Sequence, residues 1–383
     1  MRIFCHRRAT TEIKRTVGAI PIFRHQTWSR KRHVSALSSM NTMGAEYAKD
    51  CQKIDRICGS DIILVPTAQE NQVLGLALYL KSLPIVDRPR VVLNFHVDNM
   101  STETERANAT RKAFSLLNEV NNGRVIVTAP IAELAESLAL VSGPVKPRVY
   151  PLPQNYDLDT VGTIPGTTSI HPTVAVLGRP LKRKGTSWIA DIISNAHRKF
   201  GNAHFLVQSG VTNANLLGLA FKSRIHVKIG GLSPQDYAAT LNSADILLLP
   251  YVPEDYKSRT SGIFADCAAF GKIAVVPKDT WMARNIQNGN AAGVIFDPDS
   301  PIGAHDALSE ALTTRDELLD LAKPRSLYWR QHQSASAYIN QLIADLNTSN
   351  RSNLNVLKAL DARRKRPAPS NQSLAVPTIE SVL

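Results

Sequence analysis

A loop rich in cations is the first segment whose residue types could do chemistry. It reads GRPLKRKG over residues 178–185 and follows a short apolar run, so four cations lie within six positions. Arg179 could hold a diphosphate with two parallel hydrogen bonds, and Lys184 could act as a point charge beside it. The alternative is a solvated basic turn, and this loop alone does not separate the two interpretations.

A second candidate loop precedes an apolar helix that is expected to end at Gly271. The run from Thr260 through Ser261 to Gly262 would leave backbone N–H groups free at the start of that helix, where an anion can approach. Asp266, about one helical turn later, could accept hydrogen bonds from ribose hydroxyls. The alternative is structural: Ser261 caps the helix, and Asp266 complements its dipole.

His96 is the third candidate, in the sequence NFHVD at the end of an apolar run. From the end of a strand its ring could face a cleft and bond a sugar hydroxyl or a phosphate oxygen. A lone histidine serves as readily in a structural role, so both interpretations stay open.

Several other kinds of site lack their motifs. The chain contains no GxSxG, HExxH, Walker A or GxGxxG sequence, which argues against hydrolase, metalloprotease, P-loop and dinucleotide-binding functions. Its four cysteines form no CxxC pair and have no suitably spaced histidines, so neither a zinc site nor a disulfide framework is indicated. A reducing compartment fits this cysteine usage best.

The segments around these candidates alternate between short apolar strands and helical patterns, which is typical of parallel sheets covered by helices. Strands are expected at 61–66, 90–96, 124–130 and 148–153, with a helix over 103–120. Further strands are expected at 173–179, 204–210, 225–231, 245–251, 273–279 and 291–298, with five intervening helices. Ligands of open α/β sheets bind beyond the carboxyl ends of the strands, which is where all three candidates lie.

Composition indicates two domains, a linker and a tail. Residues 154–170 are rich in Gly, Thr, Asp and Pro, so they are expected to join a first domain, 1–153, to a second, 171–346. The first domain is weakly defined before residue 58, and the second ends in helices that Pro324 is expected to break or kink. The basic tail, 347–383, is expected to be mobile. The predicted fold class is α/β, with two Rossmann-like doubly wound domains.

The net charge of +13 comes from the two ends of the chain. Residues 1–40 carry nine Lys or Arg against one acid, and residues 346–383 carry six against two. The body between them has 30 basic and 29 acidic residues. Nucleic-acid-binding proteins usually show a basic stripe on a folded face, so no specific nucleic acid partner is expected.

The Arg-rich start superficially resembles a transit peptide, but a first strand followed by a basic loop is the preferred interpretation.

Taken in order, the segments of the second domain resemble the nucleotide-sugar domain of retaining, family-4 type glycosyltransferases with the GT-B fold (glycosyl transferases group 1). The resemblance covers roughly residues 173–300 and includes GRPLKRKG, LNSADILLLPY, TSGIFADCAAFGKIAVVP and AGVIFDPDS. It implies that Arg179 and Lys184 bind the donor diphosphate and that Asp266 binds ribose. It also implies that His96 contacts the sugar or its phosphate. The remaining expected donor-binding residues are Gly178, Thr260, Ser261 and Gly262.

Two features depart from the family pattern. The family carries two glutamates eight positions apart, but Ser258 stands at the first position and Asp266 at the second. Glu254 or Asp255 could substitute through a shifted loop. At the front, the family shows a Gly-rich loop after its first strand, whereas this chain reads MRIFCHRRATTEIK. The resemblance implies that the first domain binds the acceptor.

The resemblance implies a hexosyl- or related transferase that moves a sugar from a nucleoside-diphosphate sugar to a glycan, lipid-linked or small-molecule acceptor. Retention of configuration, no metal and no other cofactor are expected. The implied setting is cell-envelope polysaccharide synthesis in the cytoplasm, with peripheral contact to anionic lipid at the inner face of the membrane as a further expectation. Two alternatives stay open: a catalytically degenerate nucleotide-sugar-binding protein, and a basic nucleic-acid or membrane-surface module.

Overall fold

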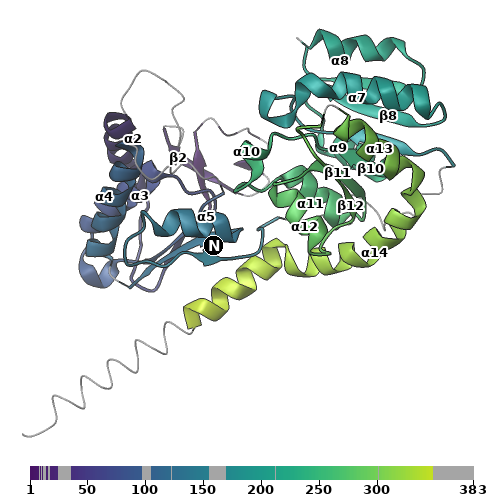
Figure 1. Cartoon of the computed structure of the whole chain (residues 1–383). Coiled ribbons are helices and arrows are strands. Elements are labelled where there is room, and N and C mark those ends of the chain that lie inside the picture. The colour runs from purple at the N-terminus through teal and green to yellow at the C-terminus, as the bar shows by residue number, and fades with distance from the viewer. Residues whose placement is uncertain are drawn as a thin grey trace, which may run out of the picture.

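The computed structural model describes residues 1–7, 9, 11, 14–15, 18–24, 36–96, 105–121, 123–154, 170–211, 213–300 and 302–347. Two α/β domains, each built on its own parallel sheet, lie side by side (Figure 1). We call the part with the four-stranded sheet the first domain and the part with the six-stranded sheet the second. The predicted linker and basic tail lie almost wholly outside the described residues.

The first domain contains a parallel sheet in the order β3-β4-β5-β6 and a separate two-stranded parallel sheet, β1-β2. The strands are β1 (Phe4–His6), β2 (Ile20–Phe23), β3 (Ile62–Val65), β4 (Arg90–Asn94), β5 (Val125–Ala129) and β6 (Arg148–Val149). The helices are α2 (Ala36–Cys51), α3 (Glu70–Lys81), η1 (Ile85–Asp87), α4 (Glu105–Val120) and α5 (Ala132–Ala139). The four strands predicted after residue 58 and the helix before residue 120 are confirmed. A first strand is also present, as expected.

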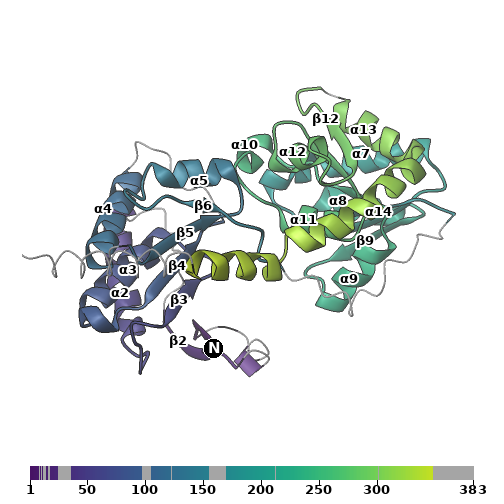
Figure 2. The same ribbon diagram turned by 90° about the horizontal axis from the view of Figure 1, so that it is seen from below.

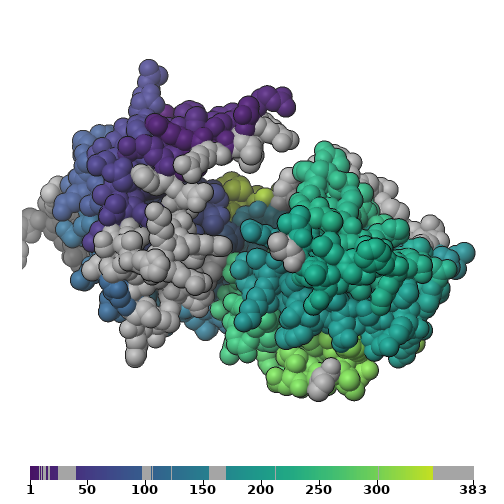
Figure 3. Space-filling view, turned by 90° about the horizontal axis from the view of Figure 1, so that it is seen from above, coloured from purple at the N-terminus to yellow at the C-terminus, as the bar shows by residue number. Residues whose placement is uncertain are grey.

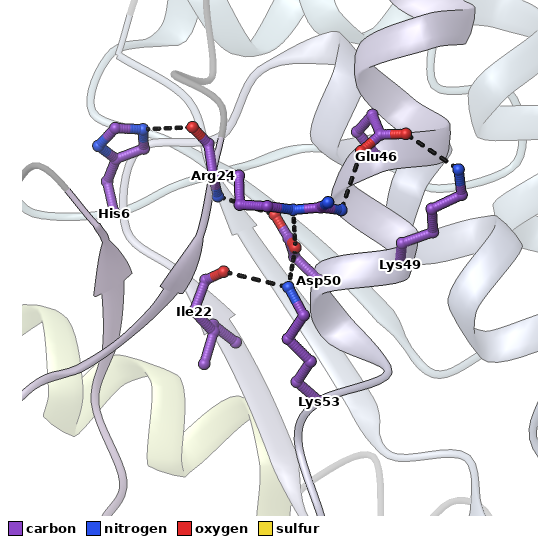
Figure 4. A network of polar contacts seen from close by, with 7 residues as sticks. All are labelled: His6, Ile22, Arg24, Glu46, Lys49, Asp50 and Lys53. Carbon is purple, nitrogen blue, oxygen red and sulfur yellow. Dashed lines mark hydrogen bonds and ion pairs between the residues drawn. The ribbon is translucent and has the colours of Figure 1, made fainter.

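The small β1-β2 sheet is held against α2 by a network of charged side chains (Figure 4). Arg24 Nε lies 2.8 Å from the buried carboxylate of Asp50, and its guanidinium also pairs with Glu46 at 2.9 Å. Burial would raise the pKa of Asp50, but hydrogen bonds from Lys53 and Arg24 outweigh burial and hold that pKa below its usual value. The charged network therefore fastens the N-terminal residues to the first domain.

The second domain contains six parallel strands in the order β12-β11-β10-β7-β8-β9. They are β7 (Thr173–Val176), β8 (His204–Ser209), β9 (Ile225–Ile229), β10 (Ile246–Leu248), β11 (Ile273–Pro277) and β12 (Gly293–Phe296). All six predicted strands are confirmed. The strand order reverses between β7 and β10, so the crevice for a ligand is expected beyond the ends of these two strands.

Helices cover both faces of this sheet (Figures 1 and 2). They are η2 (Lys182–Lys184), α7 (Thr186–Lys199), α8 (Ala214–Gly218), η3 (Leu219–Phe221), α9 (Pro234–Ser243), α10 (Pro253–Tyr256), α11 (Gly262–Ala269), α12 (Trp281–Gln287), α13 (Gly303–Thr313) and α14 (Arg315–His332). Pro324 lies inside α14, which continues past it to His332, so of the two expectations the break is wrong and the kink stays a prediction. The surface is hollowed between the two domains (Figure 3).

After α14 the chain returns to the first domain. Residues 335–347 are helical and pack on the first sheet, where Tyr338, Leu342 and Leu346 join a buried cluster with Val92, Ile126 and Tyr150. The Tyr338 hydroxyl lies 3.1 Å from Thr128 Oγ1, and the Tyr150 hydroxyl donates to the Asp345 carboxylate. The chain therefore crosses between the domains twice, once after β6 and once after α14 (Figure 2).

Candidate functional site

The two candidate loops of the second domain meet at the point where the strand order reverses. Residues 177–185 follow β7, and residues 249–261 follow β10. The Val252 amide donates to the Arg183 carbonyl at 3.0 Å, and the Pro250 carbonyl lies against Gly185. The helix α10 in the second loop lies on the side that faces the first domain (Figures 1 and 2). The structure therefore brings the basic loop and the Thr-Ser-Gly loop together, as the sequence predicted.

Gly178 is the tightest point of this junction. Its φ of +91° is one that glycine adopts readily, and an added Cβ would lie 2.4 Å from Ile263 Cδ1 and 2.6 Å from Lys184 Nζ. Its amide donates to Gln208 Oε1 at 2.7 Å, while Gln208 Nε2 donates to the Gly230 carbonyl at 2.8 Å. The carboxyl ends of β7, β8 and β9 are thereby tied to one another beside the start of α11.

A pair of touching tyrosine rings carries two of the cations. The ring centroids of Tyr251 and Tyr256 are 4.5 Å apart; Lys184 Nζ lies 5.4 Å from the first ring centre and Arg259 Cζ lies 5.8 Å from the second. Cations are attracted to the faces of aromatic rings, so the tyrosines hold both side chains in place. Arg259 was not among the predicted site residues, because one arginine in a polar loop carries no distinguishing signal.

Among the described residues, no acidic side chain pairs with the cation cluster, which comprises Arg179, Arg183, Lys184 and Arg259. Three of these cations are half-buried, whereas Arg179 is exposed. None of the ion pairs between described residues involves any of the four. Arg183 Nε is buried and has no hydrogen-bond partner among the described residues. Burial, together with the neighbouring charges of Arg183 and Arg259, lowers the pKa of Lys184 to about 8. Half-buried cations at a crevice, with no acidic partner among the described residues, favour the binding of a multiply charged anion.

The lowered pKa makes anion binding dependent on pH. The Lys184 ammonium loses its proton as the pH rises through about 8, and only the ammonium attracts a phosphate strongly. The dissociation constant of a nucleoside diphosphate is therefore expected to rise about tenfold between pH 7 and pH 9. Isothermal titration across that range measures it. Lys184→Arg, which stays charged, should give a nearly flat profile, and an equal slope in both proteins would contradict this assignment.

The helix α11 begins at the second loop, with Ser261 as its cap. Ser261 Oγ accepts from the Phe264 amide at 3.2 Å, so the structural interpretation of this hydroxyl is confirmed. Thr260 is half-buried just before it, and Gly262 is exposed at the first helical position. The first N–H groups of a helix have no partner within the helix, so those of Gly262 and Ile263 could receive an anion beside Gly178.

Asp266 lies one turn into α11 and is held by two neutral donors. The Tyr237 hydroxyl donates to Oδ2 at 2.6 Å, and Gln154 Nε2 donates to Oδ1 at 2.6 Å. Burial raises the pKa of Asp266, and these two hydrogen bonds partly offset that effect. Each carboxylate oxygen can accept more than one hydrogen bond, so capacity for ribose hydroxyls remains.

His96 lies at the end of β4 in the first domain. Its Nε2 is 3.0 Å from both the Pro66 carbonyl and Asn94 Nδ2. Burial lowers its pKa, and the hydrogen bond to Pro66 partly offsets that effect, so the ring is neutral near pH 7. No contact between described residues joins His96 to the cation cluster, and residues 97–104 lie outside the described part.

The described residues contain no group of three His, Cys, Asp or Glu side chains that could hold a metal ion. The chain has Asp-x-Asp pairs at 157–159 and 297–299, a pattern that can bind metals. In the second pair, Lys278 Nζ lies 3.0 Å from Asp297 and 3.9 Å from Asp299. One ammonium group therefore already pairs with these carboxylates.

Comparison with known proteins shows similarity at the level of structure. No protein-family model matches the chain, and no curated protein matches its sequence. The HepE protein of Anabaena, in complex with UDP and glucose, is similar over 88% of both chains, with a TM-score of 0.59 and 13% identity. A glycosyltransferase of Rickettsia africae is similar over 89% of this chain and 88% of its own, with a TM-score of 0.58 and 14% identity.

A third similar structure is the sucrose-phosphate synthase of Thermosynechococcus elongatus, which covers 86% of this chain and 84% of its own at a TM-score of 0.56 and 15% identity. These matches span both domains, so they concern the whole architecture and not only one Rossmann-like unit. The chain therefore has the two-domain GT-B fold of these glycosyltransferases, as the resemblance in its sequence predicted.

Proposed function

We propose that the chain is a glycosyltransferase that uses a nucleoside-diphosphate sugar as its donor. The observation that carries the proposal is the cation cluster, which has no acidic partner in the described part of the chain and lies where the strand order of the second sheet reverses. The similar HepE structures hold UDP and UDP-glucose, which supports a donor of this class.

In the proposed reaction, the bond between the anomeric carbon and the diphosphate oxygen breaks, and a bond from that carbon to an acceptor oxygen forms. The acceptor hydroxyl loses its proton, and negative charge grows on the departing diphosphate. Lys184, Arg179 and Arg259, together with the backbone N–H groups at the start of α11, would stabilise that charge without a metal ion. Retention of configuration, through attack from the leaving-group side, follows only from the family resemblance.

The missing glutamate of the family pattern bears on catalysis. Ser258 stands in its place, and Glu254 and Asp255 are exposed on α10, with no bond to the cation cluster among the described residues. This departure favours one alternative function, a protein that binds a sugar nucleotide without turning it over. Consumption of the donor separates that alternative from an enzyme.

A thermal-shift screen against nucleoside diphosphates and their sugar conjugates tests donor binding. A ligand at about 100 times its dissociation constant adds about 2.7 kcal/mol of stability. We expect one nucleotide to raise the melting temperature, and the shift to shrink in Arg179→Ala but persist in the matched variant Lys182→Ala. Lys182 is exposed in the same loop. If no nucleotide stabilises the protein, the donor-site assignment is wrong.

The acceptor is proposed by class only: a glycan, a lipid-linked sugar or a small molecule bound by the first domain.

No described helix has both the length and the apolar character needed to cross a bilayer. A cytoplasmic protein that touches anionic lipid through its basic ends remains our proposal for location. Vesicle flotation should then weaken as salt rises, and binding that ignores salt would contradict it. A nucleic-acid or membrane-surface module would lose its activity without residues 347–383, whereas a transferase would keep its chemistry.

A further inference from the structure

The segment that carries the chain out of the first domain reaches into the donor site. Gln154 is the last described residue after β6, and its side-chain amide touches α11 of the second domain. We propose that Gln154 is a positioning residue that fixes the Asp266 carboxylate for ribose binding and so couples the geometry of the domain crossing to donor affinity. This inference rests on the proposed function.

The contacts of Gln154 are made with two residues on the same face of α11. Its Nε2 lies 2.6 Å from Asp266 Oδ1 and 3.4 Å from the Gly262 carbonyl, four positions earlier in the helix. Residues four apart in a helix lie one above the other, so a single amide spans the first turn of α11. That turn also contains Ile263, which lies beside Gly178 and close to Lys184 Nζ.

The backbone of Gln154 is tied to the second crossing of the chain. Its carbonyl accepts from the Ala335 amide at 2.9 Å, and Gln333 Oε1 accepts from the Leu152 amide at 2.9 Å. The outgoing and returning segments are thus bonded to each other at the position from which the Gln154 side chain extends. A change in the angle between the domains would move this position relative to α11 and withdraw one donor from Asp266.

Asp266 is the group that would respond to such a change. It is half-buried, no ion pair between described residues involves it, and its other oxygen is held by Tyr237 from within the second domain. A carboxylate with one fixed oxygen can still rotate, whereas two fixed oxygens define its plane. The two ribose hydroxyls can both donate to one carboxylate only if the plane of that carboxylate is correctly oriented.

The test compares two ligands that differ only in the ribose hydroxyls: UDP and 2′,3′-dideoxy-UDP, with the corresponding ADP pair measured beside them. Gln154→Ala should weaken UDP or ADP binding about tenfold. This fold-change matches the free energy expected for one hydrogen bond to a charged group. It should leave the dideoxy analogue within about twofold of the wild-type value. Gln154→Glu keeps the side-chain length but repels Asp266, so its loss for the ribose-bearing ligand should be larger.

Gln341→Ala is the matched control, because Gln341 Nε2 donates to the Val149 carbonyl at 3.3 Å, a bond between the returning helix and the first domain that involves neither Gln154 nor Asp266. It should leave the ratio between the two ligands unchanged. Equal weakening of both ligands by Gln154→Ala would overturn the positioning role, as would no weakening at all. A wild-type protein that binds neither ligand would instead refute the proposed function, so the two failures are distinguishable.

Discussion

Replacement of Lys184 by methionine is expected to lower the rate of donor consumption by about 100- to 1000-fold, equivalent to about 2.7–4 kcal/mol of transition-state stabilisation. Lys184 Nζ lies next to Gly178 and above Tyr251, at the crevice between β7 and β10. The charge on the diphosphate grows as the sugar departs, so a fixed cation there stabilises the transition state more than the bound donor.

The apo protein should not be destabilised by this change. Burial and the neighbouring charges of Arg183 and Arg259 lower the pKa of Lys184 to about 8, which means that the folded protein holds this ammonium at a cost in free energy. Methionine has a similar length and needs no solvation, so the melting temperature without ligand should stay the same or rise. Lys182→Met, in the same turn but exposed, serves as the control. A Lys184 variant with near-normal turnover would contradict the assignment of the diphosphate site.

Replacement of Gly185 by alanine is expected to lower the free energy of unfolding by about 2–4 kcal/mol. Gly185 has a φ of +65°, and an added Cβ would lie 1.8 Å from the Pro250 carbonyl oxygen. Backbone of the loop after β10 would have to move away from η2, and the two candidate loops would separate.

Gly289→Ala is the matched control for this prediction. Gly289 has a φ of +75° but has open space around its Cα, so only the backbone conformation is strained and about 1 kcal/mol is expected. Fluorescence of the buried Trp281 and Trp329 reports unfolding of the second domain in a urea titration. Equal midpoints for the two variants would show that the close approach of Gly185 and Pro250 is not needed.

The strands could be predicted from the sequence because each is a short apolar run bounded by polar residues. In β11 every residue from Ile273 to Pro277 is buried, so the run must lie inside a covered sheet. The helices of the first domain were harder to predict: α3 is buried along much of its length, including the polar Gln72 and Asn71, and lacks a clear polar face.

The basic loop and the Thr-Ser-Gly loop could be placed together, because both follow strands on either side of one crevice. The supports of Asp266 could not be predicted. Tyr237 is 29 residues away from it in sequence and Gln154 is 112 residues away, and no local pattern pairs such side chains. The return of residues 335–347 to the first sheet was missed for the same reason, since an amphipathic helix does not indicate which sheet it covers.

The central claim is that the cation cluster supports sugar transfer from a nucleoside-diphosphate sugar. Phosphorus NMR of the purified protein with UDP-glucose, and with other donors that the thermal-shift screen selects, follows donor and released diphosphate directly. We predict release of nucleoside diphosphate that depends on the protein and nearly vanishes in Lys184→Met. A donor that binds tightly yet stays intact over long incubation, with and without candidate acceptor sugars, would contradict an enzyme and favour a binding protein with the same fold.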